Sequence, residues 1–152
     1  MNAALHSLTR RPRSESELRS RLRQRGFEDA HIDKTLSKLR EQGLTDDVAF
    51  ARLWTENRES FSPRSRFLLQ RELRKKGLDE EIIAATVEGV DEESSAYRAA
   101  QKKARVLKTS DYSSFQGKLI GFLRRRGFGY DVCRRTVNRV WQERSEGGQN
   151  AQ

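Results

Sequence analysis

Three stretches of the chain repeat one spacing of apolar residues around a central glycine. The glycines are Gly26, Gly77 and Gly127, which lie 51 and 50 residues apart. Apolar residues stand eight and four positions before each glycine, and one, six, ten and thirteen positions after it. In chain order these positions hold Leu18, Leu69 and Leu119; Leu22, Leu73 and Leu123; Phe27, Leu78 and Phe128; Ile32, Ile83 and Cys133; Leu36, Val87 and Val137; and Leu39, Val90 and Val140. Such spacings are those of a helix face, so each stretch predicts two helices that meet at the glycine.

The residues beside each glycine predict where the helices end and begin. A glycine just past the last helical turn adopts the left-handed conformation that closes a helix. Acidic residues follow each glycine within a few positions, where they complement the positive end of the next helix dipole. Ser14 and Glu17 have the spacing of a capping box. Ser62 before Pro63 predicts a cap residue and then a proline at the first helical position.

One more helix is predicted ahead of each pair, over residues 3–10, 46–58 and 93–108. This grouping gives three-helix repeats at residues 1–42, 43–91 and 92–146, followed by a disordered tail at residues 147–152. Each repeat alone is too small to bury a good core, so neighbouring repeats must stack. We therefore predict an all-α protein whose three tandem repeats form an elongated, curved, solenoid-like body.

The composition narrows the class of protein. Of the 152 residues, 34% are hydrophobic and 35% are charged, which favours a thin structure over one with a thick core. Cys133 is the single cysteine, which excludes an intrachain disulfide and a cysteine-based zinc site. With only His6 and His31 besides, we expect no metal. No apolar run of about 18 residues and no signal peptide is evident, so we expect a cytoplasmic protein without a membrane segment.

No enzyme class is indicated by the sequence. It contains no phosphate-binding glycine loop, dinucleotide fingerprint or Ser/His/Asp set, so we predict neither catalysis nor a cofactor. The acidic pair Asp46 and Asp47 opens a predicted helix, and we interpret it as a cap. We expect Cys133 to be buried and both histidines to lie on the surface. Gly117 and Gly121 predict a close helix crossing.

Basic residues are the main functional candidates, because the formal net charge is +9 and positive charge increases toward the C-terminus. A cluster precedes each repeat glycine, and more basic residues follow on the predicted helices. The candidates for binding a polyanion are Arg23, Arg25, Arg74, Lys75, Lys76, Arg98, Lys102, Lys103, Arg105, Arg124, Arg125, Arg126, Arg135 and Arg139. A stripe of this kind suits phosphates or an acidic protein groove. The alternative is that basic residues in a last turn only complement the helix dipole.

Four aromatic residues are secondary candidates for stacking on bases, with core packing as the favoured alternative for each: Trp54, Phe61, Tyr130 and Trp141. Phe27 and Phe128 are not candidates, because both occupy repeat positions that the pattern assigns to the core.

Four stretches together resemble the bacterial RecX family, regulators of the RecA recombinase. They are residues 11–18 (RPRSESEL), 43–51 (GLTDDVAFA), 72–78 (ELRKKGL) and 122–128 (FLRRRGF). The resemblance implies three tandem three-helix repeats in a curved body, in agreement with the repeat. It also implies a role in DNA recombination, DNA repair and the SOS response, as a protein that lies in the groove of the RecA–DNA filament and bridges its subunits.

On this basis we expect a negative regulator of homologous recombination that inhibits ATP hydrolysis and strand exchange by RecA. Its partners would be the RecA filament and DNA, single-stranded or duplex and bound weakly alone, and we expect a monomer. The alternative is a free-standing, sequence-nonspecific DNA-binding helical repeat protein, because basic three-helix units resemble helix-turn-helix modules. A RecA regulator would act substoichiometrically on a preformed filament, whereas a coating protein must saturate the DNA.

The repeat and the low apolar content make a direct prediction about shape. Circular dichroism should show almost only helix, and small-angle X-ray scattering should give a particle longer than a compact sphere of this mass. Substantial strand content or a compact scattering profile would contradict the predicted architecture.

Overall fold

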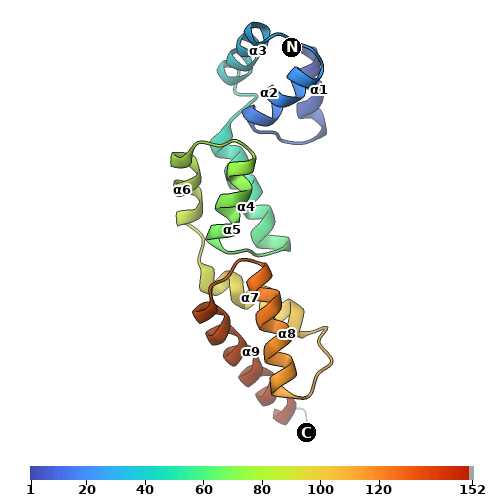
Figure 1. The fold of residues 1–152 in the computed structure, drawn as a ribbon, viewed down its shortest axis with the longest axis vertical. Coiled ribbons are helices and arrows are strands. Elements are labelled where there is room, and N and C mark those ends of the chain that lie inside the picture. Colours follow the sequence, from blue (N-terminus) through green and yellow to red (C-terminus); the bar gives the residue numbers. More distant parts are fainter. Residues whose placement is uncertain (151–152) are drawn as a thin grey trace. The chain divides into compact units, whose positions relative to one another are not determined.

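The structure, a computed structural model, describes the backbone of residues 1–150 and the side chains of residues 1–147. The described chain is all helical, which confirms the predicted fold class. Its helices are α1 (Asn2–Arg10), α2 (Glu15–Gln24), α3 (Asp29–Glu41), α4 (Asp47–Phe61), α5 (Arg66–Lys75), α6 (Glu80–Glu88), α7 (Glu92–Ala104), α8 (Tyr112–Arg125) and α9 (Tyr130–Asn150) (Figure 1). Residues 147–150 of the tail that was predicted to be disordered lie in α9, and residues 151–152 lie outside the described residues.

The helices group into two compact units. Unit 1 contains Met1–Thr55 and Gln70–Glu88, and unit 2 contains Glu56–Leu69 and Gly89–Gln152. The limits of the units therefore fall inside α4 and α5, and each of these helices contributes to both units. The division into three repeats at residues 1–42, 43–91 and 92–146 stays a prediction.

In unit 1, the helices α1, α2 and α3 share a small apolar core (Figure 1). Its buried members are Ala4, Leu18, Leu22, Ile32, Leu36 and Leu39. Apart from Ala4, which comes from α1, all of these are repeat positions. Leu73, Leu78 and Ile83 are buried as well, as the pattern predicts. Phe27 is the exception, because 45% of its surface is exposed.

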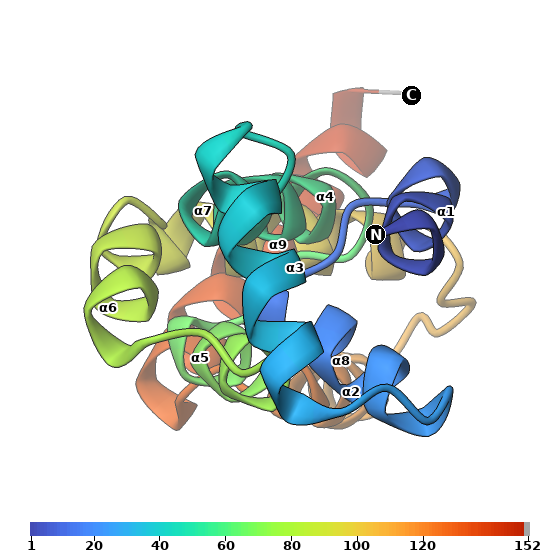
Figure 2. The same ribbon diagram turned by 90° about the horizontal axis from the view of Figure 1, so that it is seen from above.

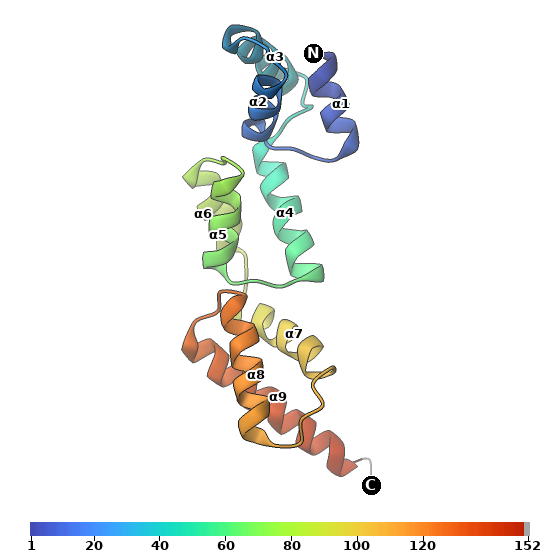
Figure 3. The same cartoon turned by 45° about the vertical axis from the view of Figure 1, so that its right-hand side comes forward.

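In unit 2, the helices α7, α8 and α9 pack around a second core (Figure 3). The buried members are Ala96, Ala99, Ala100, Phe115, Leu119, Leu123, Phe128, Cys133, Val137 and Val140. α7 contributes only alanines to this set, so it can approach α8 and α9 closely. Cys133 is buried, as predicted, and burial raises the pKa of its thiol, which keeps it protonated and unreactive.

Each repeat glycine closes a helix in the left-handed conformation, as predicted. The φ angles of Gly26, Gly77 and Gly127 are 90°, 78° and 91°. Behind Gly77, the Leu78 amide donates to the Leu73 carbonyl at 3.3 Å, and the same bond joins the equivalent residues at the other two glycines. This is the Schellman arrangement, which satisfies carbonyls that a helix end leaves open. It also explains why the positions four before and one after the glycine are apolar, since the two residues meet there.

The predicted helix starts are confirmed at α2 and α4. Ser14 and Glu17 form the capping box at the start of α2. Asp46 caps α4, because its carboxylate accepts from the amides of Val48 and Ala49 at 3.0 and 3.1 Å. The neighbouring Asp47 instead accepts from the Glu15 amide at 3.0 Å.

At α5 and α7 the predicted limits were wrong. Pro63 is not the first residue of α5, because Ser65 is the cap and accepts from the Leu68 amide at 3.0 Å. Ser62 and Pro63 lie in the connection before α5. α7 ends at Ala104, so Arg105 follows the last helical residue and the predicted extension to residue 108 is absent.

The glycine turn after α5 packs on the start of α2, within unit 1. The Ser14 hydroxyl donates to the Lys76 carbonyl at 2.7 Å. A Cβ on Gly77 would lie closer than 3.0 Å to the Ser16 hydroxyl, so no larger residue fits there.

A matching contact occurs within unit 2, where the glycine turn after α8 packs on the start of α5. The Ser65 amide donates to the Arg126 carbonyl at 3.0 Å. A Cβ on Gly127 would again lie closer than 3.0 Å to a serine hydroxyl, that of Ser65. In both units a glycine turn is therefore held against the serine-bearing first turn of an earlier helix.

This packing predicts unequal effects of the same substitution at two glycines. Gly26→Ala adds only left-handed strain, about 1 kcal/mol, because no other element of the described chain lies within 4 Å of the new Cβ. Gly77→Ala must also displace Ser16, which raises the cost to about 2–4 kcal/mol. Leu73→Ala should cost about 2–5 kcal/mol by opening a cavity. Urea denaturation followed by circular dichroism measures all three, and equal losses at both glycines would contradict the packing.

Candidate functional site

The basic candidates differ in whether another side chain of the described chain pairs with them. Several pair with a carboxylate in the described part of the chain: Arg23 with Asp29, Arg74 with Glu80, Lys76 with Glu17, Arg98 with Glu59, Arg135 with Glu93 and Arg139 with Glu143. Most of these pairs are exposed, and exposed pairs contribute little to stability. Their positive charge is nevertheless locally compensated, so they are weaker anion sites than their number in the sequence indicates.

Four candidates are exposed and have no side-chain hydrogen bond or ion pair within residues 1–147: Arg25, Lys75, Arg105 and Arg125. Arg25 and Lys75 belong to unit 1, and Arg105 and Arg125 belong to unit 2. These side chains carry uncompensated charge and are available to a partner.

The three consecutive arginines at the end of α8 have different roles. Within residues 1–147, Arg124 is exposed and makes only a long hydrogen bond, 3.4 Å, to the Phe128 carbonyl, while Arg125 makes none. Arg126 is half-buried, donates to the Ser62 hydroxyl and lies over the Phe122 ring at 5.0 Å. Burial lowers the pKa of Arg126, and its neighbours Arg64 and Arg58 lower it further. Arg126 is therefore part of the packing, and two arginines of the cluster remain for a partner.

A groove of about 240 Å³ lies beside Arg126 in unit 2. Its wall is formed by both apolar and basic side chains: Phe61, Ser62, Pro63, Ala99, Lys102, Lys103, Val106, Phe122 and Arg126. Phe61 and Val106 are 69% and 66% exposed, so apolar surface is open to solvent here. Lys102 reaches the Phe61 carbonyl at 3.4 Å, and the Lys103 ammonium lies 5.5 Å from the centre of the Phe122 ring. The groove combines cations with an exposed aromatic ring, which suits a ligand that is both anionic and partly apolar.

Sequence reasoning missed two basic residues that contribute positive charge near Arg126. Arg58 and Arg64 were not among the candidates, yet both act electrostatically on Arg126. Their position on either side of Ser62 was a usable signal. Gly117 and Gly121 were expected at a close helix crossing, but no other element of the described chain lies within 4 Å of a Cβ placed on Gly117. Gly117 is exposed, so the backbone of α8 is uncovered at this position.

Two of the remaining aromatic candidates, Trp54 and Trp141, pack on other aromatic rings. Trp54 stacks on Phe50 with ring centres 6.1 Å apart, and Trp141 packs on Phe115 at 5.0 Å. Tyr130 is exposed beside Arg134. Both histidines are exposed, as predicted. No group of acidic, histidine or cysteine side chains in the described residues could hold a metal ion, and none of the described helices is long and apolar enough to cross a membrane.

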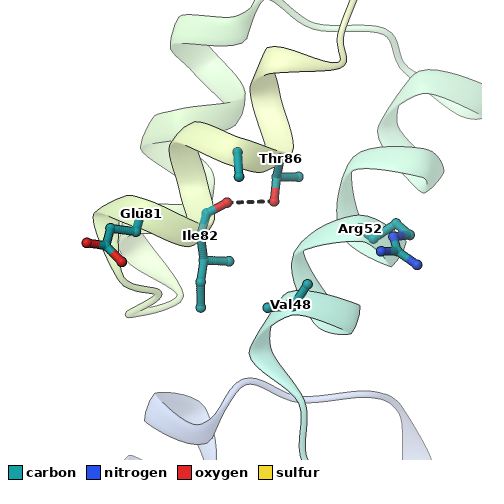
Figure 4. A pocket seen from close by; sticks show the side chains of 6 residues that line it. Val48, Arg52, Glu81, Ile82 and Thr86 are labelled. Atoms are coloured by element: carbon teal, nitrogen blue, oxygen red, sulfur yellow. Dashed lines mark hydrogen bonds between the residues drawn. The ribbon is translucent and has the colours of Figure 1, made fainter.

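A second groove, of about 400 Å³, lies between α4 and α6 in unit 1 (Figure 4). Val48 and Ile82 lie on its two sides, and Glu81 points away from α4. Thr86 donates to the Ile82 carbonyl at 2.7 Å, a bond within α6. None of the predicted basic candidates lines this groove, so we do not count it as part of the candidate anion-binding site.

Comparison with family models gives the same family for all three parts of the chain. The model for the first three-helix domain of RecX matches residues 1–39, that for the second matches residues 46–87, and that for the third matches residues 91–137. Among similar proteins, "Regulatory protein RecX" of Chlorobaculum tepidum is 37% identical over 145 residues, covering 95% of this chain and 90% of that protein. The protein of that name from Amycolatopsis mediterranei is 37% identical over 121 residues, covering 78% and 69%.

Solved structures share the fold. The crystal structure of RecX from Lactobacillus salivarius superposes with a TM-score of 0.76 at 23% identity, covering 91% of this chain and 92% of that one. A crystal structure titled as regulatory protein RecX gives a TM-score of 0.74 at 22% identity, covering 90% and 69%.

The different surroundings of Arg125 and Arg126 predict different effects on stability. Arg126→Gln removes a charged hydrogen bond to Ser62 and a ring contact, and should lower the free energy of unfolding by about 1–3 kcal/mol. Arg125→Gln should change it by less than about 0.5 kcal/mol, because the side chain is exposed. Urea denaturation of the two variants checks this, and an equal effect would place Arg126 on the open surface with Arg125.

Proposed function

The chain belongs to the RecX family, and from this premise we propose that it binds in the groove of the RecA–DNA filament and inhibits ATP hydrolysis and strand exchange by RecA. It acts as a negative regulator of homologous recombination, within DNA repair and the SOS response. It works in the cytoplasm by binding, as a monomer of three stacked three-helix repeats, and needs neither a cofactor nor a catalytic residue.

The observation that supports this proposal is the uncompensated positive charge at the end of α8. Arg124 and Arg125 are exposed and lack a carboxylate partner in the described chain, while Arg126 beside them is anchored. Arg126 fixes the end of the helix, and the neighbouring Arg124 and Arg125 guanidinium groups remain available to a partner. Guanidinium groups pair with phosphates and carboxylates through two parallel hydrogen bonds, and both kinds of group are expected on a filament of protein and DNA.

The groove beside Arg126 offers further positive charge in unit 2. Lys102 and Lys103 bring two further cations to it, and Phe61 offers an exposed ring. A filament side chain or a nucleotide that is anionic at one end and apolar at the other satisfies both features. Arg23, Arg74, Arg135 and Arg139 contribute less, since each already pairs with an acid.

The test substitutes Arg124 and Arg125, which lack a carboxylate partner in the described chain, and leaves Arg126 in place. Arg124→Gln/Arg125→Gln should raise the concentration needed for half-inhibition of the RecA DNA-dependent ATPase by about tenfold or more, because two charged contacts are lost. The matched control is Arg135→Gln/Arg139→Gln, which removes the same charge from α9 but from side chains already paired with Glu93 and Glu143. It should inhibit nearly like wild type.

Salt dependence shows which anion the arginines meet. If it is phosphate, the affinity of wild type for bare DNA falls steeply with salt, and the double variant flattens this slope by up to about two units. If it is an acidic groove on RecA, the slope on bare DNA barely changes although inhibition is lost. A folded double variant that inhibits like wild type contradicts the role of the two arginines. Wild type that acts only when it saturates the DNA would favour the free-standing DNA-binding protein instead.

A further inference from the structure

Two of the three repeat glycine turns are covered, and in the same way. In unit 1 the turn at Gly77 is held by Ser14 and Ser16, and Lys76 reaches Glu17 at 3.2 Å in the same helix start. In unit 2 the turn at Gly127 is held by Ser62 and Ser65. Both occupants are the serine-bearing first turn of a helix, or the residues just before it.

The turn at Gly26 has the same backbone but no cover. Nothing in the described chain lies within 4 Å of a Cβ placed on Gly26. Phe27 is 45% exposed, whereas its equivalents Leu78 and Phe128 are 6% and 1% exposed. Arg25 is exposed and has no side-chain partner in the described residues, whereas Lys76 and Arg126 are held. Figure 2 draws this turn, between α2 and α3, in the foreground of unit 1.

We propose that the turn Arg25–Gly26–Phe27 is a docking surface for the start of a helix on a RecA subunit. The two internal contacts define the chemistry of that helix start. A serine or threonine at its cap donates to the Arg25 carbonyl, as Ser14 does to Lys76. An acidic residue in its first turn pairs with the Arg25 guanidinium, as Glu17 does with Lys76. A small side chain in the first turn of the partner helix packs against Gly26, as Ser16 does against Gly77, and apolar surface of the partner covers Phe27. This inference rests on the proposed function, since it takes RecA as the partner.

A second copy of the chain does not offer the matching helix start. α2 and α5 have 10 residues each and begin just after a serine that stands twelve positions before the glycine. α8 has 14 residues, and the position twelve before Gly127 is Phe115, which is fully buried. Ser14 and Ser65, which are buried beneath the turns they hold, therefore have no counterpart in α8, whose cap Asp111 is a carboxylate that cannot donate. The occupant of the free turn is therefore a different protein.

Binding to purified RecA tests the surface. Fluorescently labelled Phe27→Ser is titrated onto a preformed RecA–single-stranded DNA filament and onto the same DNA alone. The filament dissociation constant should rise about tenfold, because an apolar anchor is lost from the contact, while that for bare DNA stays unchanged. The matched control is Leu53→Ser, which removes a similarly exposed apolar side chain from α4 and should bind like wild type. Arg25→Glu should also weaken filament binding, and Lys34→Glu on α3 controls for its change of charge.

A photo-crosslinking amino acid at position 27 identifies the occupant. Crosslinks to RecA that map within the first turn of a helix are the expected result. Crosslinks to DNA, to a second copy or to other parts of RecA overturn the proposal, as does filament binding by Phe27→Ser equal to wild type. In those cases the loss of inhibition in Arg124→Gln/Arg125→Gln still stands as evidence for the proposed function. If wild type does not bind the filament, the proposed function and this inference both fail.

Discussion

A left-handed glycine turn packed against the start of an earlier helix is the contact on which the rest of the structure depends. Two constraints require glycine at positions 77 and 127: φ is positive, and a serine occupies the space where a Cβ would lie. The carbonyl just before each glycine accepts a hydrogen bond from that same helix start. The apolar positions around the glycine then follow, since they close the helix and fill the core beneath it.

This contact also decides which basic residues are available to a partner. The residue before the glycine is drawn into the packing, so Lys76 and Arg126 are half-buried and held. Arg124 and Arg125, which come two and one residues before Arg126, stay on the surface. No helix start in the described chain packs on the turn at Gly26, and the corresponding Arg25 has no side-chain partner there. A run of basic residues in the sequence is therefore a mixture of structural and available charges, and the contacts of the folded chain separate them.

The fold was largely predictable because its apolar positions recur at a constant spacing, which also placed Cys133 in the core. The cap at Ser14 followed from its capping-box spacing to Glu17. Phe27 was assigned wrongly because the pattern carries no information on whether an earlier helix covers the turn. Pro63 was assigned wrongly as the first residue of α5. Ser65 is an equally good cap residue, and its hydroxyl accepts from the amide of Leu68, three residues later. The ion pairs were not predictable: Glu93 and Arg135 lie 42 positions apart, on different helices, and no local pattern joins them. The candidate site was therefore predicted too broadly.

The most direct test of the account is an electron cryomicroscopy structure of the protein on a RecA–DNA filament. We predict that the Arg124 and Arg125 guanidinium groups lie within hydrogen-bond distance of DNA phosphates or RecA carboxylates. Arg126 should keep its bond to Ser62, and the Gly127 turn should keep its packing on Ser65. A complex in which Arg124 and Arg125 face solvent, or in which the Gly127 turn leaves Ser65, would contradict it.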